Sequence, residues 1–170
     1  MHVVLYEPDI PWNTGNVGRT CVATRSTLHL VGPLGFSLEA SEVRRSGLDY
    51  WENLILRQHA AWNDFARSLP SHAPLYFFSK KAKKDFWSAT FAEGSYLIFG
   101  CETRGLPEFL HQDYADHFYR IPMEEGCVRS LNLSTAVGIA LYEALRQTSR
   151  RHPRVPLSGI HGSPASSCGG

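Results

Sequence analysis

The sequence predicts an α/β domain in which helices flank a mostly parallel sheet. Short apolar runs, typical of buried strands, alternate along the chain with segments of helical periodicity, and the connections between them are short. The clearest helix lies over residues 133–145, where apolar side chains recur at intervals of three and four residues and so form one buried face. At 170 residues the chain is long enough to bury a core in one such domain.

The first strand is predicted at residues 2–6, a short apolar run. The Asn- and Gly-rich segment 13–18 follows it. Because both residue types permit tight backbone with positive φ, we expect a turn there and a helix that begins near Asn16 and continues to about Arg25. A second apolar run, residues 28–31, is expected to form the next strand.

The middle of the chain repeats this alternation. Residues 37–46 have weak helical character, and residues 54–56 are a candidate third strand. A helix is expected at residues 61–69, which carry aromatic and aliphatic side chains on one side. Residues 75–78 then predict a strand whose end leads into a basic loop, residues 80–84.

The second half continues with a buried strand at residues 96–99, which leads into the polar loop 100–107. Pro107 suits the first turn of a short helix that continues to Leu110, because proline fixes a helical φ and needs no hydrogen-bond acceptor there. The last strand is expected at residues 117–121 and leads into the long helix described above.

The composition changes near residue 150 to Ser, Gly, Pro and Arg with few apolar side chains. We therefore expect a single domain over residues 1–149 and a disordered tail over residues 150–170. No apolar run approaches the roughly 20 residues that a membrane helix needs, and the first residues resemble a strand rather than a secretory signal. We expect a cytoplasmic protein without membrane contact.

The composition argues against a metal site and against a strongly basic nucleic-acid-binding domain. The four cysteines are widely spaced, and the eight histidines form no H-E-x-x-H pattern, so we predict reduced thiols and no metal site. The formal net charge is +1, which differs from the strongly basic balance of a nucleic-acid-binding domain that acts alone. Local basic clusters remain available for RNA.

Three polar loops follow predicted strands, at residues 11–18, 100–107 and 122–130. In an open parallel sheet ligands bind beyond the carboxyl ends of the strands, so we expect the last two loops to meet at one crevice. Ser130 and Asn132 lie there, just before the long helix, where short polar side chains also cap backbone N–H groups. The first loop lacks the first Gly of G-x-G-x-x-G, which argues against a dinucleotide site.

Three motifs carry a resemblance to a known family, and their order and intervals match as well. They are Asn13-x-Gly15-Asn16-x-x-Arg19-Thr20, Phe99-Gly100-x-Glu102-x-x-Gly105-Leu106-Pro107, and Ile121-Pro122-Met123 followed by Arg129-Ser130-Leu131-Asn132-Leu133-Ser134. Together they resemble the SPOUT class of RNA methyltransferases over about residues 1–147. Two further segments, Leu5-Tyr6-Glu7-Pro8 and Arg44-Arg45-x-Gly47-Leu48-Asp49-Tyr50, resemble one subgroup in particular. It is the small tRNA 2'-O-methyltransferase that modifies the wobble nucleotide of the anticodon, cytidine or uridine.

The resemblance implies a fold, a cofactor and a partner. The fold would be an α/β domain whose C-terminal part forms a trefoil knot, an exception to the rule that chains avoid threading. The cofactor would be S-adenosylmethionine, the substrate tRNA and the assembly a homodimer with each site near the subunit boundary. By matching position, the cofactor contacts would be Phe78, Ser79, Gly100, Glu102, Gly105, Ile121, Met123, Ser130, Leu131 and Asn132.

The chemistry asks little of side chains, because a sulfonium methyl is already activated and the protein has to align a ribose 2'-hydroxyl with it. The resemblance makes Arg19, Ser130 and Asn132 the candidate catalytic residues. Arg19 would orient the hydroxyl and favour a developing alkoxide, since a guanidinium is a poor proton acceptor. A solvated Arg19 on the first helix is the alternative, and a helix-capping Glu102 is the alternative to a cofactor contact.

The candidate RNA contacts are basic and aromatic side chains, of which Lys80 and Lys81 are expected beside the crevice: Arg19, Arg44, Arg45, Tyr50, Lys80, Lys81 and Tyr142. Contacts within a dimer, or simple solvation, remain open for several of them. The leading hypothesis is 2'-O-methylation of the wobble nucleotide of tRNA. A ribosomal RNA 2'-O-methyltransferase and a noncatalytic RNA-binding protein with the same fold are the alternatives.

Overall fold

The computed structural model describes residues 1–38, 51–124 and 126–148. Within these residues seven strands form one sheet in the order β3-β2-β1-β6-β4-β7-β5, and every pairing is parallel. The strands are β1 (His2–Tyr6), β2 (Thr27–Val31), β3 (Leu56–His59), β4 (Leu75–Phe78), β5 (Lys84–Asp85), β6 (Tyr96–Phe99) and β7 (Phe118–Arg120). The predicted parallel sheet is confirmed.

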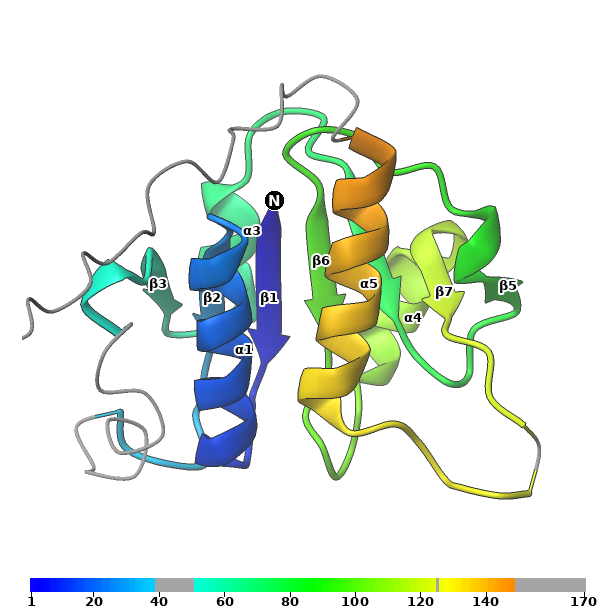
Figure 1. Ribbon diagram of the computed structural model, residues 1–170, viewed down its shortest axis with the longest axis horizontal. Coiled ribbons are helices and arrows are strands. Elements are labelled where there is room, and N and C mark those ends of the chain that lie inside the picture. Colours follow the sequence, from blue (N-terminus) through cyan, green and yellow to red (C-terminus); the bar gives the residue numbers. More distant parts are fainter. Residues whose placement is uncertain (39–50, 125, 149–170) are drawn as a thin grey trace, which may run out of the picture.

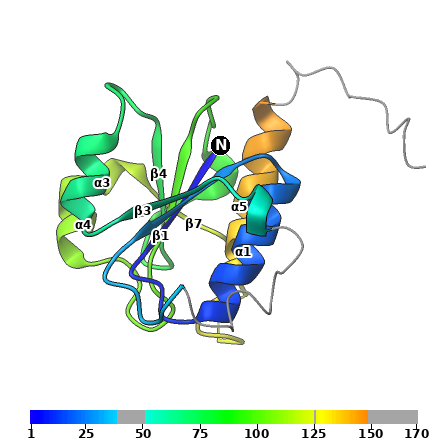
Figure 2. The ribbon, with the colours of Figure 1, turned by 90° about the vertical axis from the view of Figure 1, so that its left-hand side faces the viewer.

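Helices cover both faces of this sheet. Figure 1 shows α1 (Pro11–Ala23) and α5 (Leu133–Thr148) side by side in front of the strands, and they contact each other. The view in Figure 2 places α3 (Trp62–Ser68) and α4 (Glu108–Asp113) on the opposite face. Short 3-10 turns complete the described part: η1 (Trp51–Asn53), η2 (Phe86–Ser88) and η3 (Ala115–His117). The result is a three-layer α/β domain.

The core has two parts, one on each side of the sheet. Because side chains alternate along a strand, Val3 and Leu5 of β1 face the layer of α1 and α5, whereas Val4 faces the layer of α3 and α4. In β6 all residues are buried, which is typical of a central strand covered on both faces. The helix predicted from apolar spacing is confirmed, since Val137 and Leu141 of α5 are fully buried.

The predicted turn at residues 13–18 is wrong, because this segment belongs to α1. Helix α1 begins at Pro11, whose fixed φ suits a first helical position. Gly18 contributes close packing rather than a turn: a Cβ there would lie 3.2 Å from the Trp51 ring and 3.3 Å from the Leu54 side chain. A sequence reading that treats Asn and Gly as turn formers therefore places the helix start too late.

Other boundaries also move. The strand predicted at 54–56 lies instead at Leu56–His59, as β3, where it pairs with β2 so that Leu56 lies opposite Leu28. This edge strand contains two exposed polar residues, Arg57 and Gln58, which an apolar pattern does not predict. Pro107 precedes α4 and does not lie in its first turn. The expected helix at 37–46 lies outside the described residues from residue 39 onward, as does the predicted tail over residues 150–170.

Candidate functional site

A pocket opens at the carboxyl ends of β4, β6 and β7. Its volume is about 380 Å³, within the range of small-molecule sites in proteins. Six separate segments form its wall. They are the start of α1, the residues after β4, the loop after β6, the side of α4 that carries His111, the residues after β7 and the approach to α5. This is where a parallel sheet is expected to hold a ligand, and the predicted crevice between the last two loops is present.

All ten predicted cofactor contacts line this one pocket. They are Phe78, Ser79, Gly100, Glu102, Gly105, Ile121, Met123, Ser130, Leu131 and Asn132. Residues 54 positions apart in the chain, from Phe78 to Asn132, thus share a wall. The structure establishes that they are neighbours; their role as cofactor contacts stays a prediction.

The loop after β6 folds back on itself at the pocket wall. Gly105 donates its N–H to the carbonyl of Cys101 at 2.9 Å and has a φ of +72°, which glycine adopts without strain. A Cβ on Gly100 would lie 2.2 Å from the carbonyl carbon of Gly105 and 2.3 Å from the nitrogen of Leu106. Only glycine at residue 100 permits this backbone approach.

Glu102 fastens this loop to the start of α1. One carboxylate oxygen accepts the backbone N–H of Asp9 at 2.9 Å, and the other accepts the side-chain N–H of Asn13 at 2.9 Å. The alternative that Glu102 caps α4 is wrong, since α4 has no side-chain cap bond and the carboxylate is engaged at α1. Asn13 is only 6% exposed, so its amide is held in a buried setting.

Asn132 continues this chain of hydrogen bonds to α5. Its Nδ2 donates to Oδ1 of Asn13 at 2.9 Å, while its own Oδ1 accepts the N–H groups of Ser134 at 2.9 Å and Thr135 at 3.3 Å. The predicted capping role of Asn132 is confirmed. A path from Glu102 through Asn13 to Asn132 therefore connects all three sequence motifs across the pocket wall.

Charged and aromatic groups surround the pocket opening. Arg104 donates to Glu7 at 3.2 Å, and Thr103 donates to Asp9 at 2.6 Å, which lowers the pKa of the Asp9 carboxyl. His111 of α4 also lines the pocket and stacks on Phe118 with ring centroids 4.1 Å apart. Burial lowers the pKa of the His111 imidazole, which favours its neutral form.

The predicted RNA contacts are scattered. Lys80 and Lys81 line the pocket, and Lys80 donates to the carbonyl of Arg129 at 3.5 Å. Tyr142 is 58% exposed on α5, and the exposed Arg19 of α1 does not line the pocket of its own chain. Arg44, Arg45 and Tyr50 lie outside the described residues.

Sequence reasoning missed some members of the wall. Asn13 stood in a quoted motif, but nothing local indicated that its side chain would join two other motifs. No sequence motif marked His111 as a pocket residue, because its position at the pocket depends on how α4 packs against the sheet. In the described part of the chain no cluster of three or more His, Cys, Asp or Glu side chains is arranged to hold a metal, and no helix there is long and apolar enough to span a membrane.

Comparisons with known proteins agree with the motifs. The model of the SpoU rRNA Methylase family matches residues 1–142. A Saccharophagus degradans protein named tRNA (cytidine(34)-2'-O)-methyltransferase is 46% identical over 149 residues, which cover 86% of this chain and 94% of that protein. A Burkholderia pseudomallei protein of the same name is 44% identical over 148 residues, with the same coverage of 86% and 94%.

Solved structures give the same result. One solved structure, described as giving structural insights into the 2-OH methylation of C/U34 on tRNA, has a TM-score of 0.82 and 48% identity to this chain. The match covers 88% of this chain and 97% of that chain. An AdoMet-bound rRNA methyltransferase from Sinorhizobium meliloti has a TM-score of 0.76 and 27% identity, over 85% of this chain and 55% of that one. With a family match over residues 1–142, this chain belongs to the SpoU methylase family of SPOUT-class RNA methyltransferases.

Proposed function

We propose that this protein transfers a methyl group from S-adenosylmethionine to the ribose 2'-hydroxyl of nucleotide 34, cytidine or uridine, in the anticodon of tRNA. The observation that carries the proposal is the single pocket lined by residues of the second and third motifs and by Asn13 of the first. Relatives that are 44% and 46% identical to this chain bear the name of this activity. Ribosomal RNA is the less favoured substrate, because the rRNA methyltransferase named above is only 27% identical.

The pocket has the features that a nucleoside cofactor requires. Glycines at residues 100 and 105 let backbone N–H and C=O groups approach a ligand closely, and Phe78, Ile121 and Leu131 supply apolar contact for a base. The cofactor supplies a methyl group that its sulfonium activates for transfer. The protein then has to hold the acceptor hydroxyl in line and exclude water.

Ser130 and Asn132, which precede α5, are proposed to position the acceptor hydroxyl. The Oδ1 atom of Asn132 already accepts hydrogen bonds from Ser134 and Thr135, so Asn132 acts as a donor and not as a proton acceptor. Ser130 is exposed on the pocket wall, where its hydroxyl can orient the ribose. Both residues are proposed to position the 2'-hydroxyl.

Arg19 requires a second copy of the chain. Since its side chain is exposed and lies outside the pocket of its own chain, we assign it to the pocket of the partner in a homodimer. A guanidinium beside the ribose would stabilise the alkoxide that forms as the proton leaves. The exposed Tyr142 of α5 then belongs to the subunit boundary or to the bound RNA. The trefoil knot and a cytoplasmic location are further parts of this proposal, supported by the family resemblance.

The test is methyl transfer from labelled cofactor to a tRNA carrying cytidine or uridine at position 34. The matched control is the same tRNA with a 2'-deoxyribose at that nucleotide, which removes only the acceptor oxygen. We expect label in the first RNA and none in the second. Equal labelling of both would place the methyl group elsewhere, and RNA binding without any transfer would favour a noncatalytic binding protein.

A further inference from the structure

The side of the molecule beyond the pocket displays an exposed tryptophan. Trp87 of η2 is 66% exposed, although its neighbours Phe86 and Ala89 are 0% and 4% exposed. Burying an indole side chain is strongly favourable, so a Trp that the fold leaves in water marks a binding surface more often than a Leu or Ala would. Nothing in the catalytic proposal above uses this residue.

The turn that carries Trp87 is firmly held. Ser88 donates its hydroxyl to the carbonyl of Asp85 at 2.6 Å, and Ala89 donates its N–H to the carbonyl of Phe86 at 3.0 Å. The Phe86 and Trp87 rings have centroids 4.2 Å apart, so a buried ring supports the exposed one. The indole is therefore presented outward on a rigid base, and little conformational entropy is lost when a partner binds to it.

The surroundings of Trp87 are basic. Residues 80–88 contain four lysines and one aspartate in a chain whose formal net charge is +1. Two of these charges are neutralised locally, since Asp85 pairs with Arg120 at 2.7 Å and Lys84 pairs with Asp116 at 3.7 Å. Lys83 is exposed next to this pair, and Lys81 is exposed at the wall of the pocket.

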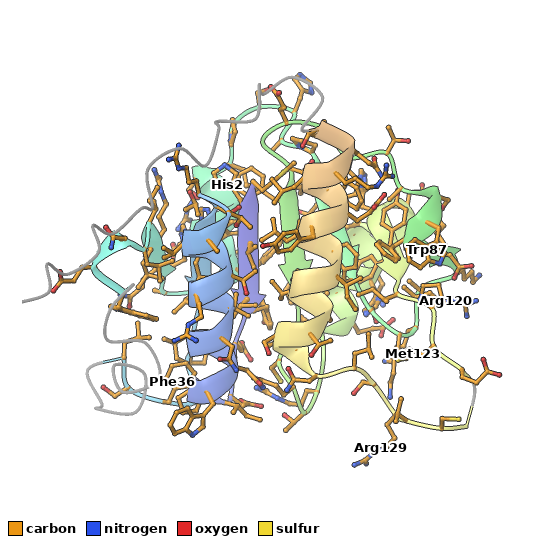
Figure 3. The ribbon with its side chains drawn as sticks, in the orientation of Figure 1. His2, Phe36, Trp87, Arg120, Met123 and Arg129 are labelled. Atoms are coloured by element: carbon orange, nitrogen blue, oxygen red, sulfur yellow. The ribbon has the colours of Figure 1, made fainter. Side chains whose placement is uncertain are left out.

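The basic side chains connect Trp87 with the pocket opening. Figure 3 shows Trp87, Arg120, Met123 and Arg129 one below another along the same side of the molecule. Met123 lines the pocket. At the Arg129 end of this row, Lys80 donates a hydrogen bond to the carbonyl of Arg129 and so links the row to the pocket wall. A polyanion that inserts one nucleotide into the pocket therefore meets Lys80 and Lys81 at the pocket wall and Lys83 in the segment that carries Trp87, whereas the charge of Arg120 is offset by Asp85.

We infer that Trp87 is a stacking platform for an unpaired base of the RNA substrate, with Lys81 and Lys83 holding the adjacent phosphates. This inference rests on the proposed function, which supplies the RNA. An aromatic face beside lysines is the usual means of holding single-stranded nucleic acid, because every base has a face that stacks and every nucleotide has a phosphate. The combination of a rigid indole and a net positive segment favours RNA over a second copy of the chain as the occupant.

The test compares Trp87→Ala, Trp87→Phe and the control Ile55→Ala in binding to an anticodon stem-loop RNA. Ile55 is 55% exposed next to β3, at the opposite edge of the sheet. Loss of one stacked base should weaken RNA binding by about tenfold in Trp87→Ala. Trp87→Phe keeps a stacking ring and should stay near the wild-type affinity, and Ile55→Ala should not differ from it.

The salt dependence of RNA affinity distinguishes the contribution of base stacking from that of phosphate contacts. Lys83→Gln should reduce the slope of log affinity against log salt by about one, because one phosphate contact is removed, whereas Trp87→Ala should leave the slope unchanged. Titration with S-adenosylhomocysteine should give the wild-type affinity for all of these variants. A common loss of cofactor affinity would overturn the inference, since it would mean that the substitutions disturb the fold.

Failure of this inference is distinguishable from failure of the proposed function. If the wild type methylates tRNA and Trp87→Ala binds RNA as tightly as the wild type, the platform is refuted and the function stands. If Trp87→Ala instead converts a dimer into a monomer in sedimentation, the occupant is a second copy and the inference is overturned. Weaker RNA binding by Trp87→Ala in a protein that transfers no methyl group would support the platform and refute the function.

Discussion

At the scale of single residues, the hydrogen-bond path across the pocket wall determines how the site is held. Glu102 accepts from Asn13, and Asn13 accepts from Asn132, so that each amide has one defined orientation. A carboxylate cannot donate, which fixes Nδ2 of Asn13 toward Glu102 and its Oδ1 toward Asn132. The position of Asn132 at the pocket therefore depends on a buried side chain of a different helix.

Asn13→Ala should destabilise the protein by about 2 kcal/mol, because it removes one bond to a carboxylate and leaves Asn132 without its acceptor. Urea unfolding measures this loss. The matched control is Asn16→Ala on the exposed side of the same helix, which should change stability by no more than about 0.5 kcal/mol. Equal unfolding midpoints for the two variants would show that the path contributes nothing.

The sequence predicted the members of the pocket better than their contacts. The family resemblance indicated Gly100, Glu102 and Asn132, and all three line the same wall. It did not indicate that Glu102 binds α1, because the bond joins residues 89 positions apart in the chain. A local sequence motif shows which residue types are present at a site. It does not show which side chains form hydrogen bonds with each other, because that depends on how the sheet brings distant segments together.

At the scale of elements, a row of three histidines joins the strands β1, β2 and β3. His2 Nδ1 lies 3.0 Å from Nε2 of His29, and His29 Nδ1 lies 3.1 Å from Nε2 of His59. Burial, then the neighbouring His2 and His59, and then Arg57 lower the pKa of the His29 imidazole to about 3. Burial also lowers the pKa values of His2 and His59, so the row is neutral in the folded protein at pH 7.

This row should make folding stability depend on pH. An unfolded His29 titrates near pH 6.5 and the folded one near 3, so the unfolded chain alone takes up the proton as the pH falls below 6.5. Stability should therefore be complete above pH 6.5 and decrease below it, by up to about 1.4 kcal/mol per pH unit for one such group. Urea unfolding between pH 7 and 5 measures this slope before most carboxylates titrate.

The control for the histidine row is His29→Phe, which keeps an aromatic ring among Phe65 and Tyr96 and removes the titrating group. Its stability should vary less between pH 7 and 5 than that of the wild type, whatever its absolute value. If both proteins lose stability at the same rate over this interval, His29 is not the group responsible.

Element boundaries show where sequence patterns reach their limit. The long apolar stripe of α5 and the short apolar runs of β1, β4 and β6 predicted those elements correctly, because burial on one or both faces dictates their composition. The start of α1 was predicted too late, since Pro11 and close packing at Gly18 override the turn preference of Asn and Gly. The two-residue strand β5 was not predicted, as Lys84 and Asp85 form it only by pairing with β7.

At the scale of the whole molecule, the location of Arg19 outside its own pocket gives the proposed homodimer a specific test. Arg19→Ala and Glu102→Ala each damage one half of a composite site. If the guanidinium acts in the partner's pocket, a mixed dimer of the two variants contains one intact site. An equimolar mixture in which subunits exchange should then regain about a quarter of the wild-type activity, since half of the dimers are mixed.

Subunit mixing has a clear contrary outcome. If Arg19 acts in its own chain, both sites of the mixed dimer carry a damaged residue, and the mixture stays as inactive as the separate variants. The same assay on Arg19→Ala alone should show slow transfer with cofactor affinity near that of the wild type, because the guanidinium is proposed to act on the ribose hydroxyl and not on the cofactor.

The central claim is that segments distant in the chain converge into one pocket for a methyl donor, and the most direct measurement of it is calorimetric titration with S-adenosylhomocysteine. The wild type should bind one molecule per chain. Gly100→Ala should bind at least about tenfold more weakly, because its Cβ would displace the backbone of Gly105 and Leu106. Gly138→Ala, on α5 with nothing within 4 Å of the added Cβ, should bind as the wild type does. No binding by the wild type, or equal binding by Gly100→Ala, would contradict the claim.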